Sequence, residues 1–373
     1  MMTMWFLDRD GFATLLEELV AQGYDLVGPT VRDGAIVMDR IDGAQDLPRG
    51  IREVQGPGAY RLEREDDDRL FEWAHGPDSA KRFLFPSHEL LSTAHRQDGQ
   101  VSIEPAALPD VRYAFVGLRS CDLHAIEVQD RVFLIADPAY RSRRENAFFI
   151  GVNCGRPGTT CFCVSMGTGP RCSMGFDLAL TELDDGFTVE AGSPKGEELL
   201  AAVATREATP VEADASLAVT GRAATHMGRR LETRDLPDLL YRNREHPRWD
   251  QVADRCLTCT NCTMVCPTCF CHDIVDGISL DGTRATRERE WASCFSEEFS
   301  HMAFGSVRTS ARSRYRQWLT HKFASWIDQF GTSGCVGCGR CITWCPVGID
   351  VTEEIAAIRV TDGEVRLTAG AGS

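Results

Sequence analysis

The chain has 373 residues, of which 43% are hydrophobic, and this is enough apolar material for two buried cores. Its formal net charge of −15 disfavours nonspecific binding to nucleic acid, because such binding depends on neutralising phosphates. The sixteen cysteines cluster at short spacings beside prolines, and no secretory pattern begins at Met1, so metal binding explains them better than disulfides do. Apolar runs such as residues 132–136 are too short to span a bilayer, and we expect a soluble, cytoplasmic protein.

The chain opens with a helical pattern and then two short strand patterns. Leu16, Leu19 and Tyr24 recur at helical spacing, whereas residues 24–27 and 35–38 read as strands on either side of a turn. The sequence therefore predicts a helix followed by a hairpin.

The next segments are more polar. A charged run at residues 63–69 predicts a solvated loop. Ser87 follows Pro86 and is a candidate helix cap, which predicts a short helix after it.

Two buried strand patterns, at residues 113–116 and 147–152, each lead into a cysteine, Cys121 and Cys154 respectively. Further on, an Asp-Asp-Gly turn between two apolar runs predicts a hairpin around residues 176–189. Residues 196–244 read as mainly helical.

Pro247 disfavours helix in the residue before it and marks the expected domain boundary. We predict an α+β protein with a mixed α/β domain at residues 1–245. A two-cluster ferredoxin-like domain follows at residues 246–355, with an insertion at about 273–330.

Two cysteine runs carry the strongest chemical signal. Each has the spacing C-x2-C-x2-C-x3-C and ends in proline, and the runs consist of Cys256, Cys259, Cys262 and Cys266, then Cys335, Cys338, Cys341 and Cys345. Soft thiolates at these spacings suit iron, and three of them can close on one cubane while the fourth reaches a neighbouring cluster.

Exchange of the fourth ligand predicts two 4Fe–4S sites. The first consists of Cys256, Cys259, Cys262 and Cys345, and the second of Cys335, Cys338, Cys341 and Cys266. Zinc is the alternative, but a zinc ribbon takes four ligands from two separated cysteine pairs, whereas each run here supplies four. The long segment at 267–334 between the runs is expected to fold as a subdomain of its own.

A third group of cysteines lies in the N-terminal domain. It consists of Cys121, Cys154, Cys161 and Cys163, with Cys172 as a spare. The glycines beside these cysteines would let the backbone wrap around a cluster and donate N–H groups to its sulfurs. A third 4Fe–4S cluster is our prediction, and buried free cysteines are the alternative.

Three cysteines, Cys269, Cys271 and Cys294, remain unassigned, and packing is the default interpretation. A basic helical stripe is predicted by Arg308, Arg312 and Arg316, with Arg314 and Lys322 close by. The stripe is either a solvated face, a dock for an acidic partner or charge compensation for an anionic cluster. These interpretations stay open at the level of sequence.

The usual nucleotide-binding motifs do not occur, and no nucleophilic triad stands out, so we predict no catalytic residues. His124 and His272 lie near cysteines, but a lone histidine is more often a hydrogen-bonded structural residue than a ligand. Electrons are expected to enter from another subunit.

The segments CLTCTNCTMVCPTCFCHD, GLRSCDLHAIEVQD and NCGRPGTTCFCVSMGTGP resemble the beta subunit of cytosolic NAD(P)-linked nickel–iron hydrogenases, also called sulfhydrogenases. The resemblance runs from about residue 113 to 351, and the same pattern is similar to the electron-transfer subunit of anaerobic sulfite reductases. It implies an electron-transfer subunit that connects a flavin/NAD(P)H subunit with a catalytic metal subunit. It also implies a helical type of two-cluster ferredoxin, with residues 250–350 mostly α-helical.

The resulting hypothesis is a non-catalytic iron–sulfur subunit of an oxidoreductase (hydrogenase) complex that relays electrons through two 4Fe–4S clusters and a third. The alternatives are the sulfite reductase subunit and, in a different class, an interaction protein with structural clusters. An enzyme in its own right is disfavoured, since no substrate signature is visible.

Overall fold

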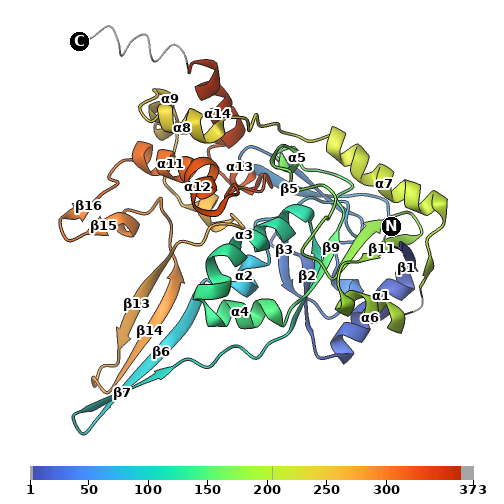
Figure 1. Cartoon of the computed structure of the whole chain (residues 1–373), viewed down its shortest axis with the longest axis horizontal. Coiled ribbons are helices and arrows are strands. Elements are labelled where there is room, and N and C mark those ends of the chain that lie inside the picture. The colour runs from blue at the N-terminus through green and yellow to red at the C-terminus, as the bar shows by residue number, and fades with distance from the viewer. Residues whose placement is uncertain (1–2, 204, 363–373) are drawn as a thin grey trace.

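A mixed eight-stranded sheet forms the N-terminal half of the computed structural model, which describes residues 3–203 and 205–362 (Figure 1). The strand order is β12-β1-β11-β10-β9-β8-β2-β3, and the central neighbours β10, β9, β8 and β2 run parallel. The strands are β1 (Trp5–Asp8), β2 (Asp25–Arg32), β3 (Ala35–Arg40), β8 (Tyr113–Leu118), β9 (Phe148–Val152), β10 (Leu178–Glu182), β11 (Gly186–Ala191) and β12 (Arg206–Glu207).

Helices cover both faces of this sheet. They are α1 (Arg9–Ala21), α3 (Ser120–Ala136), α4 (Pro138–Glu145), α6 (Pro194–Ala202) and α7 (Pro210–Thr225). Leu16 of α1 packs with Ile150 on one face, whereas Phe133 of α3 packs with Phe149 on the other. Successive residues of β9 therefore face opposite cores, which explains why this strand reads as a continuous apolar run.

The structure confirms the opening helix and hairpin, the strands at β8 and β9, the hairpin β10–β11 and the mainly helical segment after residue 196. Because β8 and β9 are parallel neighbours, their carboxyl ends meet at one edge of the sheet. Cys121 and Cys154 follow these two ends. The fold thus brings together cysteines that are far apart in the sequence.

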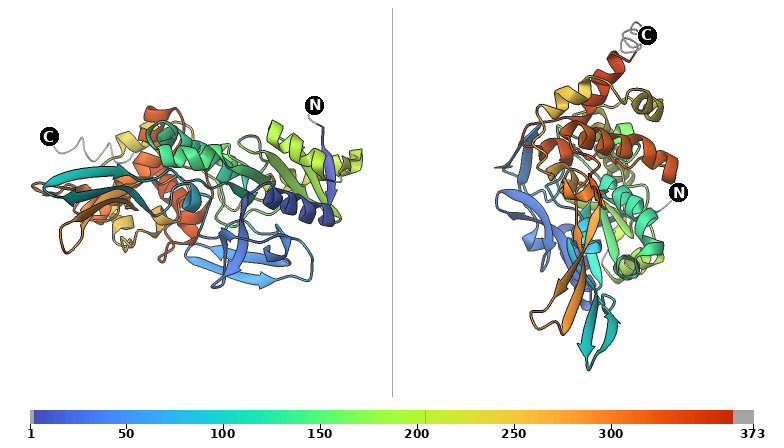
Figure 2. Two further views of the ribbon diagram at one scale, coloured as in Figure 1. Left: turned by 90° about the horizontal axis from the view of Figure 1, so that it is seen from below. Right: turned by 90° about the vertical axis from the view of Figure 1, so that its left-hand side faces the viewer.

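A second, four-stranded antiparallel sheet projects from the body as an arm (Figures 1 and 2). Its order is β13-β14-β6-β7, and its strands are β6 (His88–Gln97), β7 (Gln100–Pro105), β13 (His272–Ile278) and β14 (Arg284–Trp291). Two predictions are therefore wrong. The residues after Ser87 form a strand, not a helix, because they pair with β14, which lies almost 200 residues later in the chain and which local propensity cannot reveal. For the same reason, the segment at 267–334 is not a subdomain of its own.

The C-terminal part combines short helices around a separate core. Its helices are α8 (Leu236–Arg242), α9 (Arg248–Ala253), α10 (Asn261–Met264), α11 (Ala311–Thr320), α12 (Trp326–Phe330), α13 (Arg340–Thr343) and α14 (Val351–Val360), with a π-helical turn at His321–Ser325. The shorter elements elsewhere are β4 (Ile51–Gly56), β5 (Ala59–Arg64), α2 (Lys81–Leu84), α5 (Cys163–Met166), β15 (His301–Met302), β16 (Gly305–Ser306) and single 3-10 turns at Ala44–Asp46 and Glu298–Ser300.

The α+β class is confirmed, but residues 250–350 are not mostly helical, because the arm hairpin and long loops occupy much of this segment. The boundary near residue 245 stays a prediction, and contacts cross it. Leu239 of α8 and Phe162 of the N-terminal half both belong to the C-terminal core. No helix within the described ranges combines the length and the apolar character that a membrane crossing needs.

Two glycines bring the second cysteine run against the N-terminal half. A Cβ on Gly339 would lie 2.4 Å from the carbonyl oxygen of Thr160, and one on Gly337 would lie 2.7 Å from that of Phe162. The Phe162 N–H donates to the carbonyl oxygen of Gly337 at 2.8 Å. Only glycine allows this close approach of two backbones.

Candidate iron–sulfur sites

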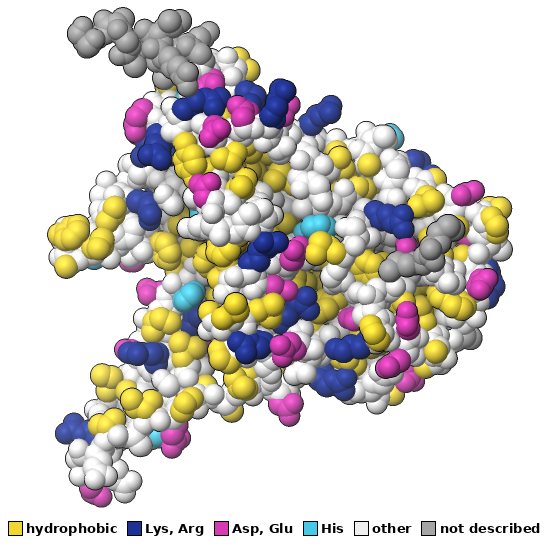
Figure 3. Space-filling view, viewed as in Figure 1, with side chains coloured by type: hydrophobic (Ala, Val, Ile, Leu, Met, Phe, Trp, Pro, Cys, Tyr) yellow, Lys and Arg dark blue, Asp and Glu magenta, His cyan; other side chains and the backbone are white. Residues whose placement is uncertain are grey.

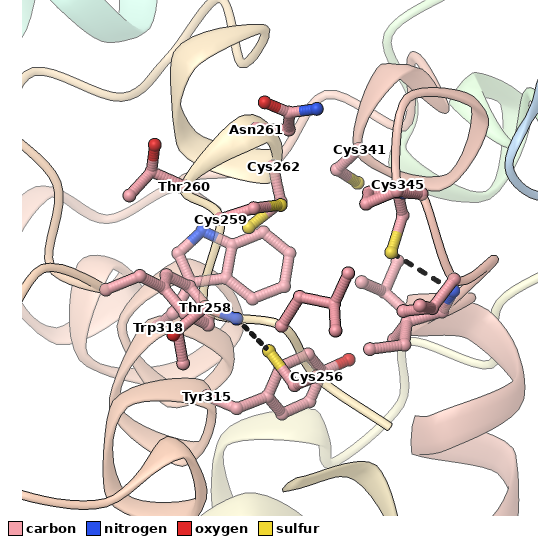
Figure 4. A pocket seen from close by; sticks show the side chains of 16 residues that line it. Cys256, Thr258, Cys259, Thr260, Asn261, Cys262, Tyr315, Trp318, Cys341 and Cys345 are labelled. Carbon is pink, nitrogen blue, oxygen red and sulfur yellow. Dashed lines mark hydrogen bonds between the residues drawn. The ribbon is translucent and has the colours of Figure 1, made fainter. Parts of the chain in front are cut away.

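The first cavity is lined by three cysteines of the first run and the last cysteine of the second (Figure 4). These are the predicted ligands Cys256, Cys259, Cys262 and Cys345. The N–H of Thr258 donates to the Cys256 sulfur at 3.4 Å, and the N–H of Ile349 donates to the Cys345 sulfur at 3.3 Å. Backbone donors of this kind stabilise thiolate ligands of iron–sulfur clusters.

The two cysteine runs fold alike. Thr258 and Thr260 of the first run have φ angles of 50° and 69°, and the matching Gly337 and Gly339 of the second have 66° and 79°. Each run needs these left-handed residues because its cysteines must turn toward one point within a few residues. The N–H of Gly337 donates to the sulfur of Cys335 at 3.4 Å, which repeats the Thr258 contact.

The second cavity lies beside the first and is lined by the other predicted ligands. These are Cys266, Cys335, Cys338 and Cys341. Lys322 also lines this cavity, and its ammonium group donates to the Thr268 hydroxyl at 2.7 Å. Burial alone would lower the pKa of Lys322, but nearby thiolates, Cys266 foremost, outweigh burial and raise it. A buried cation thus stands beside a set of anionic ligands.

The third cavity gathers the N-terminal group of four cysteines. It is lined by Cys121, Cys154, Cys161 and Cys163, all of them buried. His75 and Arg119 line the same space, and His75 Nε2 lies 3.2 Å from the sulfur of Cys121. Burial lowers the pKa of His75, so the imidazole is neutral and can donate one N–H to that sulfur.

The three cavities form a continuous series. Cys341 lines both the first and the second cavity, and Cys338 lines both the second and the third. Cys161 also directs its thiol at the carbonyl oxygen of Cys338, at 3.6 Å. Neighbouring cavities are therefore separated by little more than the side chain of a predicted ligand.

The pattern of the 4Fe-4S dicluster domain family matches residues 255–349, which include both cysteine runs. The chain is also 34% identical over 255 residues to the sulfhydrogenase 2 subunit beta of Pyrococcus furiosus, a match that covers 67% of this chain and 75% of the relative. The chain belongs to the family of sulfhydrogenase beta subunits. No solved structure matches it. This confirms the resemblance given by the motifs, and the chain is an iron–sulfur electron-transfer subunit with 4Fe–4S clusters.

The residues of this beta subunit fit such clusters. Each cavity offers at least four thiols, the donor that iron–sulfur clusters prefer. Among the described residues, three buried polar groups at the cavities have no hydrogen-bond partner. They are the Trp318 Nε1 and the Tyr315 hydroxyl at the first cavity and the Ser120 hydroxyl at the third. These groups are placed to donate to cluster sulfurs.

Burial raises the pKa of most thiols in the cavities, including Cys121, Cys161, Cys262 and Cys341. Without iron these thiols would be protonated at neutral pH. Iron binding must displace their protons, which couples loading of the clusters to proton release.

A buried ion pair stands between the second and third cavities. Arg340 Nη2 lies 2.9 Å from the carboxylate of Asp122, and the side chains are only 3% and 7% exposed. Arg340 also donates to the carbonyl oxygen of Gly76 at 3.1 Å. The pair ties α13 to α3, the helix that begins with Ser120 and Cys121, and so fixes the two ligand sets relative to each other.

The basic stripe is divided between the surface and the interior. Arg312 and Arg316 pair with Glu245, and Arg314 is buried, where it donates to the carbonyl oxygen of Phe295. Lys322 provides the charge compensation that was one interpretation of the stripe. Arg314 and Lys322 therefore serve the interior, and Arg312 and Arg316 make surface ion pairs.

The two histidines singled out in the sequence make local hydrogen bonds. Ring atoms of His124 and His272 lie within hydrogen-bonding distance of the carbonyl oxygens of Ser120 and Phe270. No sequence pattern pointed to His75, which lies among ordinary loop residues and reaches Cys121 only through the tertiary fold.

The four spare cysteines lie at different places. Cys172 is buried, and its backbone N–H donates to the Asn153 side chain at 2.7 Å. Cys269 is a hydrogen-bonding neighbour of Cys266 beside the second cavity. Cys271 and Cys294 contact each other at the base of the arm.

Proposed function

We propose that this beta subunit relays electrons through three 4Fe–4S clusters, from a flavin/NAD(P)H-binding subunit to a nickel–iron hydrogenase catalytic module or in the reverse direction. The observation that carries the proposal is the series of three cavities that share Cys341 and Cys338 as walls. A structural role for the cysteines would not require such a series.

The proposed ligand sets are those predicted from the sequence. The first site takes Cys256, Cys259, Cys262 and Cys345, the second takes Cys335, Cys338, Cys341 and Cys266, and the third takes Cys121, Cys154, Cys161 and Cys163. Bound clusters supply one-electron steps, which connect two-electron nicotinamide and flavin chemistry to a metal centre. The protein holds the ligands, buries all four cysteines of the third cavity and supplies N–H donors to the sulfurs.

The first cavity is the end of the series that approaches solvent. Cys259 is exposed, and the neighbouring Leu257 has 62% of its surface exposed. The four cysteines of the third cavity are all buried. We therefore propose that a partner subunit covers the surface around Leu257 and exchanges electrons with the first site.

Iron and acid-labile sulfide analysis of anaerobically purified protein tests the number of clusters. We expect about twelve irons per chain, because each of three clusters holds four. Cys154→Ser should lower this number to about eight, and Cys172→Ser, a buried cysteine outside the three sets, should leave it unchanged. A wild-type value of about eight, unaffected by Cys154→Ser, would reduce the relay to two clusters.

Affinity purification of the tagged subunit from its native cells tests the partners. Recovery of a nickel–iron subunit together with a flavoprotein supports the proposal, whereas recovery of a sirohaem protein would replace the hydrogenase by a sulfite reductase. A redox titration separates the relay from a structural role: relay clusters should be reduced and reoxidised reversibly by a nicotinamide-linked flavoprotein, and structural clusters should not.

A further inference from the structure

Cys271 and Cys294 lie at the base of the arm, at the ends of paired strands. His272 of β13 pairs with Trp291 of β14, and the N–H of Ala292 donates to the carbonyl oxygen of Cys271 at 2.9 Å. Antiparallel pairing thus continues past the last strand residues and brings the two cysteines together. Both side chains are partly exposed.

The side chain and the backbone of Cys294 lie close enough to the Cys271 sulfur to stabilise its thiolate. The thiol donor lowers the pKa of Cys271 to about 7. Cys271 is therefore the member of the pair that more readily forms the thiolate, whereas contact with Cys271 and burial raise the pKa of Cys294, which keeps its proton.

The pair does not belong to a cluster site. Each of the three cavities already has four cysteines, and neither Cys271 nor Cys294 lines any of them. Among the described residues, no three cysteine sulfurs lie close enough together to bind a single metal ion. What remains is the chemistry of two adjacent thiols, which is disulfide formation.

A buried lysine connects the pair to the second cavity. The positive charge of Lys322 acts on both Cys271 and Cys294, and the same side chain lines the second cavity. A nearby cation favours the thiolate form, which is the attacking species in thiol–disulfide exchange.

We propose that Cys271 and Cys294 are a redox-active dithiol that closes to a reversible disulfide by exchange with a small-molecule disulfide. The thiolate of Cys271 attacks one sulfur of the external disulfide, forms a mixed disulfide and releases one thiolate. Cys294 then gives up its proton and attacks the Cys271 sulfur, which breaks the mixed disulfide and releases the second thiolate. Two electrons pass from the protein thiols to the external disulfide, and a dithiol reductant reverses both steps.

Closure changes the charge beside the second cavity, a consequence that rests on the proposed function. The thiolate of Cys271 partly offsets the charge of Lys322, and the disulfide is neutral. After closure the lysine charge acts on the second site with less compensation, so reduction of a cluster there becomes easier. The disulfide should therefore shift the potential of that cluster in the positive direction.

Peptide mapping tests the site on the anaerobically purified complex. The protein is treated with oxidised glutathione, its remaining thiols are alkylated, and the digest is analysed by mass spectrometry. We expect a linked peptide between Cys271 and Cys294, loss of both thiols from the alkylated pool, an unchanged iron content and full reversal by dithiothreitol. Cys172→Ser, the matched control, should still form the link.

Two results would overturn the proposal. One is recovery of Cys271 and Cys294 as separately alkylated residues after oxidation. The other is a loss of about four irons in both Cys271→Ser and Cys294→Ser, which would make these residues cluster ligands. The linked peptide does not depend on the number of clusters, so a wild-type iron content of about eight would contradict the proposed relay and leave the disulfide intact.

Electron paramagnetic resonance during a redox titration tests the coupling. The potential of the second cluster should be more positive after oxidation of the wild type by glutathione disulfide, and Cys294→Ser should abolish this shift. An equal shift in Cys294→Ser would show that the effect arises elsewhere and would refute the coupling.

Discussion

Replacing Lys322 with methionine should lower the reduction potential of the second cluster site. The ammonium group of Lys322 is buried, bonds to the Thr268 hydroxyl at 2.7 Å and lies beside Cys266 and Cys335. Its raised pKa keeps it charged at neutral pH. Methionine has a similar length and no charge, so the substitution removes the cation and keeps most of the packing.

The size of the effect can be estimated for a cation that stands directly beside an anionic ligand set. Opposite charges about 4 to 6 Å apart, at an effective dielectric constant of about 20, interact by about 3 to 4 kcal/mol. For a one-electron couple this corresponds to about 120 to 180 mV. Because a cation stabilises the added electron, its removal should shift the potential in the negative direction.

The assay is a redox titration followed by electron paramagnetic resonance, with the iron content measured on the same sample. Lys322→Arg keeps the charge and should stay within about 30 mV of the wild type, a change below about 1 kcal/mol. Lys195→Met removes an exposed lysine that donates to the carbonyl oxygen of Glu145, and should leave the potential unchanged. A positive shift in Lys322→Met, or no shift with full iron content, would refute the electrostatic role.

Three further changes test the packing around the cavities. Gly339→Ala should impair cluster loading, because the new Cβ would lie 2.4 Å from a backbone oxygen. Gly331 has a similar φ of 71° but open space around it, so Gly331→Ala should cost only about 1 kcal/mol of strain. Equal iron contents in the two variants would contradict this prediction. Arg340→Met should destabilise the fold by about 3 to 5 kcal/mol, because it leaves Asp122 buried without its partner. The additional change Asp122→Leu should restore most of this stability. Thermal inactivation of the single and double variants measures both effects. Burial lowers the pKa of His321 to about 4, so the unfolded chain binds a proton between about pH 6.5 and 4 that the folded chain does not. The free energy of unfolding should be constant above this range and fall by up to about 3 kcal/mol toward pH 4. As the pH falls, the visible absorbance of the clusters should decrease less steeply in His321→Gln than in the wild type. An equal decrease in both proteins would refute the assignment.

The grouping of the cysteines around the cavities could be predicted from the sequence because the chemistry of the cysteines is local. The spacing within each run and the terminal proline identify the two cluster motifs, and the strands before Cys121 and Cys154 place these residues at one sheet edge. The arm could not be predicted, because β6 and β14 are separated by about half of the chain and each reads locally as a polar segment. The contact of His75 with Cys121 depends on tertiary packing in the same way.

The segment between the two cysteine runs is what distinguishes this subunit from a minimal two-cluster ferredoxin, and its position in the fold explains its length. Trp318 of α11 lines both the first and the second cavity, and Lys322 lines the second. Both residues come from this segment, so it supplies the wall and the cation that the short loops of the cysteine runs lack. The same segment supplies the hairpin that completes the arm with β6 and β7. Figure 3 shows the arm at the lower left, with apolar side chains exposed along the arm. A deletion of the segment would therefore open the two cavities and expose the edge of β6 at once, so this subunit needs the segment for both its cluster sites and its arm.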